Sequence, residues 1–518
     1  MKSNFIYTSI LLFHLVVPNT VGQDSIPAVS LNSFDLMPVL NPWLSSTNPA
    51  GLSLNPSILP GKMNLGYHHE TGDFKRVQQG ESLNHYNFQT QRYTKIENTF
   101  FYGSFSYDKS FEKGIDYSNE NNPYRGTPYL LIDTIGNDIY DREFFSLKGI
   151  LSTPLNHYIS WGISSDFNVG LASQNRDPRP RNKVLKLSVS PGLLFSYSKL
   201  DIGFNLLYSY YNEDIGIDII EKFRQMAFFQ LHGLGTYITH VAGSFNRLYK
   251  QNSFGGEAQV NYKAGSITSL LGVKLLYVKE IANDGRKAGD ASWSYVKNDS
   301  EFEGTNLEIY NTTIINHNSS IHYFHSIVKI NSMLGAEILQ RIETSGETDA
   351  TNWVTYAKEE KYCSYLIDAE LSYSYLKMKE EFIRNYEFKF AVNYYGFEQA
   401  YYIPNREESY KNLILSLGFD KSFYLNSHIF SISTGLKYKQ NISSNLNFEE
   451  NTFIYYNILL PDYNFLTTDF YAPWLKLSYE IPLNIIFDKY FFMTRVDLYR
   501  GNNDQTRTIF NFSTGVIF

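Results

Sequence analysis

The stretch LDIGFNLLYSYYNE, residues 200–213, indicates the fold of this chain. Its even positions are apolar or aromatic from Leu200 to Tyr210, whereas its odd positions include Asp201 and Glu213. Alternation with a period of two residues is the pattern of a β-strand. Strands of soluble proteins average about 5–6 residues, but a strand that crosses a membrane needs roughly 9–11. The stretch therefore predicts a long strand of the kind that crosses a membrane.

The same alternation returns along most of the chain. It is clear in HYISWGISSDFNVGLA (157–172), IDAELSYSY (367–375), HIFSISTGLKYK (428–439) and TRTIFNFSTGVIF (506–518). The alternate positions are too polar for a strand that is buried on both faces of a sandwich. They suit a barrel whose outer face meets lipid and whose inner face meets water or a plug. Aromatic residues gather toward the strand ends, as they do in the interfacial girdles of such barrels.

The composition excludes several other classes of protein. The chain has 518 residues with 42 Tyr and 38 Phe, and its formal net charge is -7. No basic patch suggests a nucleic-acid partner. Cys363 is the single cysteine, which excludes an internal disulfide and a Cys-rich metal site. Its strand parity predicts a small apolar residue facing lipid, not a nucleophile. After residue 23 no window approaches the apolar length of a transmembrane helix.

The strand pattern predicts a transmembrane antiparallel β-barrel, an all-β fold of about 18 strands within a range of roughly 14–20. Long outer loops and short turns alternate only if 305–328 is one strand and 236–247 belongs to an outer loop. The predicted strands are 62–75, 82–94, 99–113, 143–154, 157–172, 183–197, 200–214, 248–263, 266–280, 305–328, 332–346, 361–376, 385–402, 411–424, 427–443, 467–481, 488–501 and 505–518.

The N-terminus divides into two parts before the barrel. Residues 1–22 read as a secretory signal peptide, because Lys2 precedes an apolar stretch and small residues precede Gln23. The alternative is a buried first helix. No cysteine follows the apolar stretch, so an N-terminal lipid anchor is not expected. Residues 23–61 form a separate segment, and the barrel occupies 62–518.

The segment 23–61 is rich in Pro, Asn and Ser and shows no periodicity. It is unusually long for a loop without structure of its own. Spaced apolar residues such as Leu36, Trp43 and Leu52 favour packing over free disorder. We expect this segment to lie in the lumen or at the periplasmic mouth, the alternative being a segment that hangs free in the periplasm.

Two resemblances to known families accompany these patterns. Asn48, Pro49 and Ala50 in NPAGLSLNP resemble the Asn-Pro-Ala element of the FadL-type outer-membrane transporters, which implies an N-terminal hatch that plugs the barrel. Residues 122–149, 177–195 and 254–262 resemble an outer-membrane β-barrel family of unknown function from Bacteroidota-type Gram-negative bacteria. That resemblance implies a location in the outer membrane and genes near TonB-dependent receptors and surface lipoproteins, but it implies no activity.

Charged residues at inward positions are candidates for the lining of a pore. Their mixed signs fit either a solvated pore or an inter-strand network that fills a closed lumen, and the sequence does not separate these alternatives. Arg495 and Asp497 are spaced to meet on one face, which suggests a structural pair first. The candidates are Asp166, Asp201, Asp368, Glu370, Lys437, Lys439, Arg495 and Asp497.

No motif indicates catalysis or a metal. His68 and His69 are adjacent on a predicted strand and so point to opposite faces, and His322 and His325 do the same. HExxH, G-x-S-x-G and P-loop motifs are absent from the sequence. We therefore expect no catalytic, metal or cofactor-binding residue, and a protein that is not an enzyme.

Two outer-loop features have a structural interpretation beside a functional one. The arginines around Asp177-Pro178 (Arg176, Arg179 and Arg181) suit a rigid turn, or alternatively an anionic sugar or lipopolysaccharide. Residues 217–232 form either a loop packed on its neighbours, which we favour, or a short amphipathic helix.

The last strand predicts how the barrel is completed. Phe510, Phe512 and Phe518 are expected to face lipid, while the strand pairs with the first one so that no edge is left in the membrane. The terminal Phe518 resembles the last-residue aromatic that the outer-membrane assembly machinery reads. The expected partners are thus this machinery, outer-membrane lipid and lipopolysaccharide.

Two functions follow as hypotheses. The first is a porin-like channel or transporter for a small or amphipathic solute, gated by residues 24–61. The second is an accessory or binding barrel whose long outer loops contact a surface lipoprotein, a TonB-dependent receptor or an extracellular ligand. The sequence does not identify the substrate.

Overall fold

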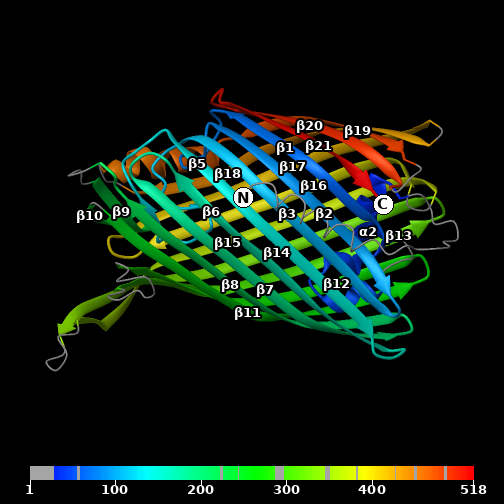
Figure 1. Cartoon of the computed structure of the whole chain (residues 1–518), viewed down its shortest axis with the longest axis horizontal. Coiled ribbons are helices and arrows are strands. Elements are labelled where there is room, and N and C mark those ends of the chain that lie inside the picture. Colours follow the sequence, from blue (N-terminus) through cyan, green and yellow to red (C-terminus); the bar gives the residue numbers. More distant parts are fainter. Residues whose placement is uncertain are drawn as a thin grey trace, which may run out of the picture.

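The computed structural model describes residues 29–54, 59–221, 226–242, 244–285, 297–344, 351–380, 383–425, 427–448, 452–483 and 487–518. Eighteen strands form one antiparallel sheet. The sheet closes because β1 (Gly61–Gly72) pairs with β2 (Ser82–Ile96) on one side and with β21 (Thr506–Ile517) on the other (Figure 1). The predicted fold class, a closed antiparallel barrel, is confirmed.

The other barrel strands follow in chain order, and each pairs with its neighbours. They are β3 (Thr99–Ile115), β5 (Asp138–Pro154), β6 (Ile159–Gln174), β7 (Arg179–Tyr197), β8 (Leu200–Asp218), β11 (Ser244–Ala264), β12 (Ile267–Asp284), β13 (Lys297–His317), β14 (Ser320–Thr344), β15 (Thr351–Glu380), β16 (Ile383–Tyr401), β17 (Arg406–Leu425), β18 (His428–Asn447), β19 (Phe470–Pro482) and β20 (Lys489–Gly501).

Large apolar side chains cover the outside of the barrel. On β8, Phe204, Leu206 and Tyr208 are 52%, 67% and 45% exposed, whereas the intervening Asn205 is 4% exposed. Because successive side chains of a strand point to opposite faces, the inner face is the polar one. An apolar exterior around a polar interior is the arrangement of a transmembrane barrel. None of the described helices has the length and apolar character needed to cross a membrane.

The two ends of the barrel differ. Val29 and Phe518 lie at one end, where the peptide groups of Gly61 and Phe518 exchange hydrogen bonds of 2.6 and 3.0 Å. The turns at this end are short, as at Glu97-Asn98 and Asn318-Ser319. We call it the short-turn end and the opposite one the long-loop end. The expected signal peptide, residues 1–22, lies outside the described residues.

One strand prediction was wrong. The sequence suggested a single strand over 305–328, but the structure has a two-residue turn at Asn318-Ser319 that divides it into β13 and β14. Asn318 has a φ of 50°, a left-handed conformation that Asn tolerates better than most residues. The break between the predicted strands 305–328 and 332–346 lies instead inside β14. The apolar alternation continues on both sides of the turn, so it gave no signal of the interruption.

The hairpin of β14 and β15 projects beyond the rim at the long-loop end. The pairing of β13 with β14 stops at Ser300 and Glu337, and the pairing of β15 with β16 stops at Tyr362 and Tyr401. Residues 338–344 and 351–358 consequently pair only with each other. They form the two-stranded arm at the lower left of Figure 1. The predicted loop 347–360 is therefore too long, because strand structure resumes at Thr351.

Four segments at the long-loop end carry structure of their own. A small sheet in the order β10–β9–β4 is built from β4 (Leu131–Ile132), β9 (Met226–Gly233) and β10 (Thr236–Ala242). A helical turn η3 (Tyr455–Leu459) continues into α3 (Leu460–Thr467). The amphipathic-helix alternative for 217–232 is wrong for the described part, which contains the ends of β8 and most of β9.

Candidate functional site

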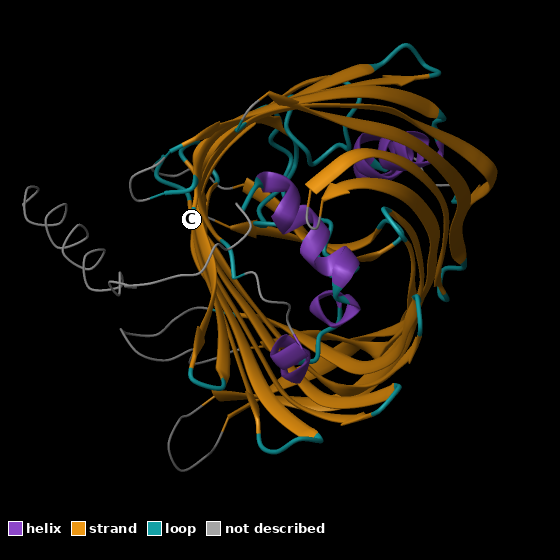
Figure 2. Ribbon diagram, turned by 90° about the vertical axis from the view of Figure 1, so that its right-hand side faces the viewer, coloured by secondary structure: helices purple, strands orange, loops and turns teal. Residues whose placement is uncertain are grey.

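Residues 29–54 lie inside the barrel at the short-turn end, and we call them the plug. They form α2 (Leu31–Leu40) and the 3-10 helices η1 (Pro42–Ser45) and η2 (Pro49–Leu54), which Figure 2 shows crossing the lumen. Ser30 caps α2 by accepting a 3.3 Å hydrogen bond from the Ser33 amide. Asn41 accepts a 3.1 Å bond from the Trp43 amide and so begins η1. The described part of the predicted segment 23–61 thus lies in the lumen.

The predicted hatch residues Asn48, Pro49 and Ala50 lie against the barrel wall. The Asn48 amide donates to the Leu193 carbonyl on β7 (3.1 Å) and to the Gln259 side chain on β11 (3.0 Å). Its own side-chain oxygen accepts from the Ala50 amide at 3.0 Å, which fixes the local turn. The Asn-Pro-Ala element therefore joins the plug to two strands far away in the sequence.

Three glycines on adjacent strands allow this close approach. A Cβ atom on Gly162 of β6 would lie 2.7 Å from the Ala50 nitrogen, and one on Gly192 of β7 would lie 2.3 Å from the Asn48 side-chain oxygen. A Cβ on Gly203 of β8 would lie 2.7 Å from the Asn48 side-chain nitrogen. We call these three residues the glycine floor. Any larger residue there would displace the plug or the wall.

A second polar contact lies beside the first. The Thr47 hydroxyl donates to the Glu257 carboxylate on β11 and accepts a 3.1 Å hydrogen bond from Asn205 on β8. Glu257 also accepts a 2.6 Å hydrogen bond from the Tyr310 hydroxyl on β13. The C-terminal half of the plug is thus held by side chains from several neighbouring strands.

The N-terminal half of the plug contacts the opposite part of the wall. The Leu31 amide, at the start of α2, donates to Glu480 on β19 at 3.2 Å. A carboxylate at this position also complements the positive end of the helix dipole. Arg384 donates to the Asn32 side chain at 3.3 Å, and Asn32 donates to Ser422 on β17 at 3.4 Å. The plug is consequently held at both ends, across the width of the lumen.

The plug separates two cavities. The first, of about 650 Å³, lies between Thr47 and Pro49 of the plug and Lys148, Asp166 and Lys186 of the wall. We call it the outer cavity, since its wall residues lie farther from the short-turn end.

The second cavity, of about 600 Å³, opens at the short-turn end between the plug and the wall, and we call it the inner cavity. Trp43 lines both cavities. The Trp43 Nε1 and Asn261 Oδ1 atoms are buried without a hydrogen-bond partner among the described residues. Trp43 therefore lies between the two cavities, and the plug is the partition between them.

The opposite mouth of the lumen is covered by a cap. We give this name to residues 73–81, 116–137, 226–242 and 452–469, which pack together at the long-loop end. Ile132, Leu231, Ile454 and Ile458 form its apolar centre, with Val77 packed beside them. The cap is therefore a small core made of loops, and it lies over the barrel mouth instead of extending into solvent.

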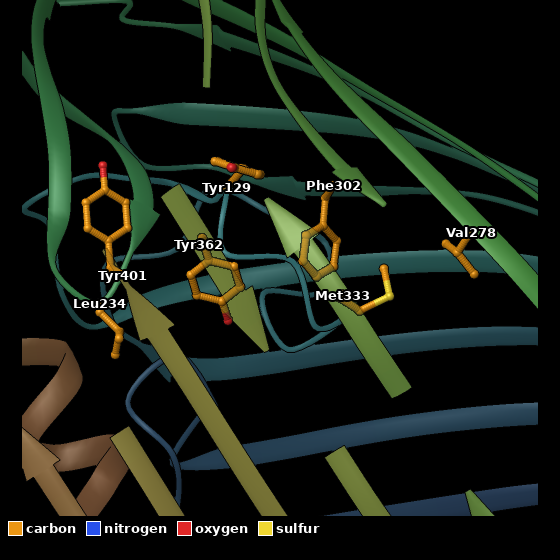
Figure 3. Packing of buried hydrophobic residues seen from close by; sticks show 7 residues of the cluster. All are labelled: Tyr129, Leu234, Val278, Phe302, Met333, Tyr362 and Tyr401. Atoms are coloured by element: carbon orange, nitrogen blue, oxygen red, sulfur yellow. The ribbon is translucent and has the colours of Figure 1, made fainter. Parts of the chain in front are cut away.

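A cluster of buried side chains joins the cap to the barrel wall. Tyr129 and Leu234 come from the cap, and the other members lie on the wall (Figure 3). The wall members are Val278, Phe302, Met333, Tyr362 and Tyr401. Burial of such aromatic and aliphatic surface stabilises the closed arrangement.

Buried charges make a second connection between the cap and the wall. Arg247 on β11 has no exposed surface, and it donates to Asp284 (2.7 and 2.8 Å) and to Asp299 (2.9 Å). It also donates to the carbonyl of Tyr129 in the cap at 3.4 Å. Such a bidentate, charge-assisted arrangement is among the stronger hydrogen-bonding patterns in proteins.

Two carboxyl groups of the cap titrate near neutral pH. Burial raises the pKa of Glu120 to about 7, although the nearby Arg125 guanidinium opposes the shift. Burial also raises the pKa of Asp133 to about 7, against the Ile135 amide that donates to it. Glu120 accepts hydrogen bonds from the Leu131 amide (2.8 Å) and from the Tyr249 hydroxyl. Docking of the cap on the barrel is therefore more favourable when these two carboxyl groups are protonated.

The structure disperses the predicted lining charges around the inner wall. Asp166 lines the outer cavity. Asp201 accepts from Asn261 at 2.9 Å and pairs with Lys263 at 2.7 Å near the short-turn end. Asp368 accepts a 2.6 Å hydrogen bond from Asn393.

Five candidates remain. Glu370 shares the inner face of β15 with Asp368, and the other four lie on β18 and β20. Arg495 and Asp497 form the expected pair, with N–O distances of 2.8 and 2.6 Å. Lys439 donates to the carbonyl of Leu466 in the cap at 2.6 Å, and Lys437 lies on the same face of β18. The eight residues do not form one cluster, and their role as pore lining stays a prediction.

The histidines have structural partners. His68 contacts Asn511 (2.6 Å) and Glu70 (2.7 Å), whereas the neighbouring His69 contacts Asn84 (3.0 Å). Among the described residues there is no group of three or more His, Cys, Asp or Glu side chains that could hold a metal ion.

The loop around Asp177 forms a hydrogen-bonded turn. Asp177 accepts from Arg179 (2.8 Å) and from the amides of Ile220 (3.2 Å) and Glu221 (3.1 Å). These contacts favour the interpretation of this loop as a rigid turn.

Sequence reasoning missed the residues that receive the plug. Gly162 and Gly203 occupy visible inward positions, so the parity of the strands could have marked them. Gly192 and Gln259 carried no such signal, because their importance depends on contact with Asn48.

Comparisons with known proteins identify a family for this chain and solved structures with a similar barrel. A family model described as "Family of unknown function (DUF6850)" matches residues 49–518. No curated protein matches the sequence. The structure of the RagAB peptide importer in its closed-closed state is similar with a TM-score of 0.42 and 7% identity, covering 89% of this chain and 87% of that chain.

Two other solved structures are similar to the same degree. The copper transporter OprC gives a TM-score of 0.39 and 8% identity, covering 90% of this chain and 82% of that chain. BauA, the ferric preacinetobactin receptor from Acinetobacter baumannii, gives a TM-score of 0.39 and 9% identity, covering 88% of this chain and 80% of that chain. The likeness is one of large barrels and supports no assignment of a solute.

Proposed function

The chain belongs to a family of unknown function, DUF6850, and we propose that it is an outer-membrane channel or transporter for a small or amphipathic solute, gated by its plug. The observation that carries this proposal is the position of the plug between the outer and inner cavities. A solute that passes through the barrel has to displace residues 41–54. The proposal places the protein in the outer membrane of a Gram-negative bacterium, as its apolar exterior and polar interior favour.

The way in which the plug is held supports a gate. The contacts of its described residues with the wall are hydrogen bonds and side-chain packing. Each hydrogen bond contributes about 0.5–1.5 kcal/mol net, so the hydrogen bonds of Asn48 and Thr47 with the wall together amount to a few kcal/mol. A conformational equilibrium of this size can be shifted by a ligand that prefers one state. Release of the plug requires that these hydrogen bonds break together with the packing of Trp43 and Ala50 against the wall.

Conductance measurements test the proposal. Single-channel recordings and liposome swelling should show low permeability for the full chain and a clear increase when residues 29–54 are deleted. Heat-modifiable mobility on gels establishes that both forms are folded barrels. A folded barrel that stays silent in both forms, and also after removal of the cap residues 116–137, would rule out a pore.

A second function is favoured by the projecting hairpin. Residues 338–344 and 351–358 leave both outer edges of a two-stranded arm without strand partners within the described residues. Exposed strand edges are surfaces on which another chain can add a strand. An accessory barrel could use this arm to contact a surface lipoprotein, a TonB-dependent receptor or an extracellular ligand.

Co-purification separates the two functions. Extraction from native membranes in mild detergent should yield a stable partner if the barrel is an accessory protein. The same extraction of a variant lacking residues 338–361 should lose that partner while the barrel stays folded. A clean monomer from the full-length protein weighs against the accessory role.

A further inference from the structure

A small cavity between the cap and the wall has the character of an aromatic cage. Its volume is about 230 Å³, and it lies against the inner faces of β15, β16 and β17. The cap supplies one aromatic ring, and the wall supplies four. These five lining residues are Tyr124, Tyr362, Tyr395, Phe397 and Tyr410. We call this space the cage.

One carboxylate in the cage has an unused oxygen. Glu408 is 5% exposed, and its Oε2 atom accepts a 2.8 Å hydrogen bond from Gln399. The Gln399 oxygen is itself occupied, because it accepts a 2.6 Å hydrogen bond from the Tyr362 hydroxyl. Within the described residues the second oxygen of Glu408 has no hydrogen-bond donor. These two hydrogen bonds orient the carboxylate but leave its second oxygen without a donor.

The other charges of the cage neutralise each other. Arg76 donates to Asp462 twice, at 3.2 and 2.7 Å, and its guanidinium lies 3.6 Å from the ring centre of Tyr124. These two residues are the only other charged groups that act on Glu408 among the described residues. The cage therefore holds one carboxyl group that, among the described residues, no protein cation pairs with. A buried carboxyl group of this kind keeps its proton unless a cation lies beside it, so an ammonium ion from outside the chain would hold Glu408 in its charged form.

We propose that the cage binds a small organic ammonium group. The faces of aromatic rings carry negative charge density and attract cations, most strongly where water is excluded. Glu408 supplies the full charge that such a cation requires. The volume corresponds to roughly seven water molecules at ~30 Å³ each, which suits a group the size of choline. The proposal adds the class of solute to the proposed function. Binding in the cage does not depend on that function, but passage of the solute through the barrel does.

The binding test compares a cation with its neutral isostere. Isothermal titration of the full chain in detergent should detect choline, and 3,3-dimethylbutan-1-ol should bind at least about tenfold more weakly. The two molecules have nearly the same shape, so the difference reports the positive charge. Equal affinity for both, or binding of neither, overturns the proposal.

Paired variants locate the site. Glu408→Gln removes the charge with little change of shape and should weaken choline binding at least about tenfold. Glu407→Gln is the matched control, because Glu407 is the adjacent residue and is exposed on the outer face of the same strand. Unchanged binding in Glu408→Gln, with a folded barrel by heat-modifiable mobility, overturns the assignment.

A second pair tests the rings. Tyr410→Phe retains the aromatic face and should keep most of the affinity, whereas Tyr410→Leu should lose it. Equal losses in both variants would assign the contact to the hydroxyl and contradict the cage.

Measuring conductance in parallel keeps the two proposals separable. Binding of choline to a barrel that never conducts leaves the cage in place and removes the channel. A barrel that conducts after deletion of the plug but binds no ammonium leaves the channel and removes the cage.

Discussion

The side-chain amide of Asn48 donates a 3.0 Å hydrogen bond to the side chain of Gln259, which lies 211 residues later in the chain. Both residues are buried, and Asn48 also donates to the Leu193 carbonyl at 3.1 Å. One side chain thus ties the plug to β7 and β11 at once. The plug is held in the lumen by contacts between residues that are remote in sequence. Single substitutions at these contacts can therefore measure how firmly it docks.

Replacing Asn48 by Ala should loosen the plug. The change removes three hydrogen bonds and leaves the Gln259 oxygen without its buried donor, at a cost of about 1–3 kcal/mol. Hydrogen exchange of residues 41–54 should become faster in this variant. Ser45→Ala is the control, because among the described residues its hydroxyl donates a single hydrogen bond, to the Pro42 carbonyl within the plug. Equal protection in Asn48→Ala and the wild type would contradict the docking role.

Replacing Gly192 by Ala should open the lumen without any change to the plug itself. The added Cβ would lie 2.3 Å from the Asn48 side-chain oxygen. We expect higher conductance in planar bilayers than for the wild type. Gly149→Ala on β5 is a matched control, because a Cβ at this position has no atom within 4 Å. The same conductance in both variants would argue against the idea that contact with the glycine floor keeps the plug closed.

The docking of the cap should weaken as the pH rises. The pKa values of Glu120 and Asp133 are about 7 in the docked cap, against about 4 for free carboxyl groups. Between these values the docked cap binds more protons than the undocked one, so stability falls from about pH 4 to about pH 7 and then levels off. Proteolysis of residues 116–137 should therefore be faster at pH 8 than at pH 5.

A double variant tests the origin of this pH dependence. Glu120→Gln with Asp133→Asn should remove most of the difference, whereas Glu97→Gln at the short-turn end should leave it intact. A pH response that survives in the double variant would assign it to other groups.

Replacing Arg247 by Met should destabilise the barrel at its long-loop end. The change leaves the buried carboxylates Asp284 and Asp299 without their arginine, and such a loss costs about 3–5 kcal/mol. The unfolding midpoint in urea, followed by heat-modifiable mobility, should fall. Arg341→Met removes an arginine that is 68% exposed and paired with Glu343, and it should change stability by less than about 0.5 kcal/mol. Similar midpoints for the two variants would contradict the role of Arg247.

Deleting Phe518 should reduce the amount of assembled barrel in membranes. Its ring packs over Gly61, lies 5.4 Å from the Arg92 guanidinium and is 5.8 Å from the ring of Phe487. The expected recognition by the assembly machinery would be lost together with these contacts. Asn503→Ala, in an exposed turn at the opposite end, serves as the control. An undiminished heat-modifiable form in membranes of the truncated protein would refute the prediction.

The barrel strands could be predicted because lipid and water impose opposite requirements on alternate residues. That signal ends where a strand leaves the membrane. Lys279 and Lys358 point outward at the long-loop end and pair with Glu301 and Glu303. Beyond the membrane, charged residues occupy the outward positions that are apolar in the part of each strand that faces lipid. The outer ends of β12, β13 and β15 were therefore predicted as loops although they are strands.

The cap and the receiving wall could not be predicted in the same way. Ile132 pairs with Phe229 in the small sheet, and nothing in either short stretch indicates the other. The Asn-Pro-Ala element was visible as a motif, but its partner Gln259 was not, because a hydrogen bond between distant strands leaves no local periodicity. The cage around Glu408 also combines the cap with three strands. Sites made of contacts between distant parts of the chain require the three-dimensional structure.

The plug is joined to β1, and β1 pairs with the last strand, β21. The glycine floor lies on β6, β7 and β8, which precede the seam by many strands in the chain. A sheet that has not yet joined β1 to β21 is open along one side, and the plug can settle on its floor from that side. Joining the two strands then encloses it, so no segment has to be threaded through a finished ring. The order of the chain thus allows the pairing that completes the barrel to enclose the plug as well.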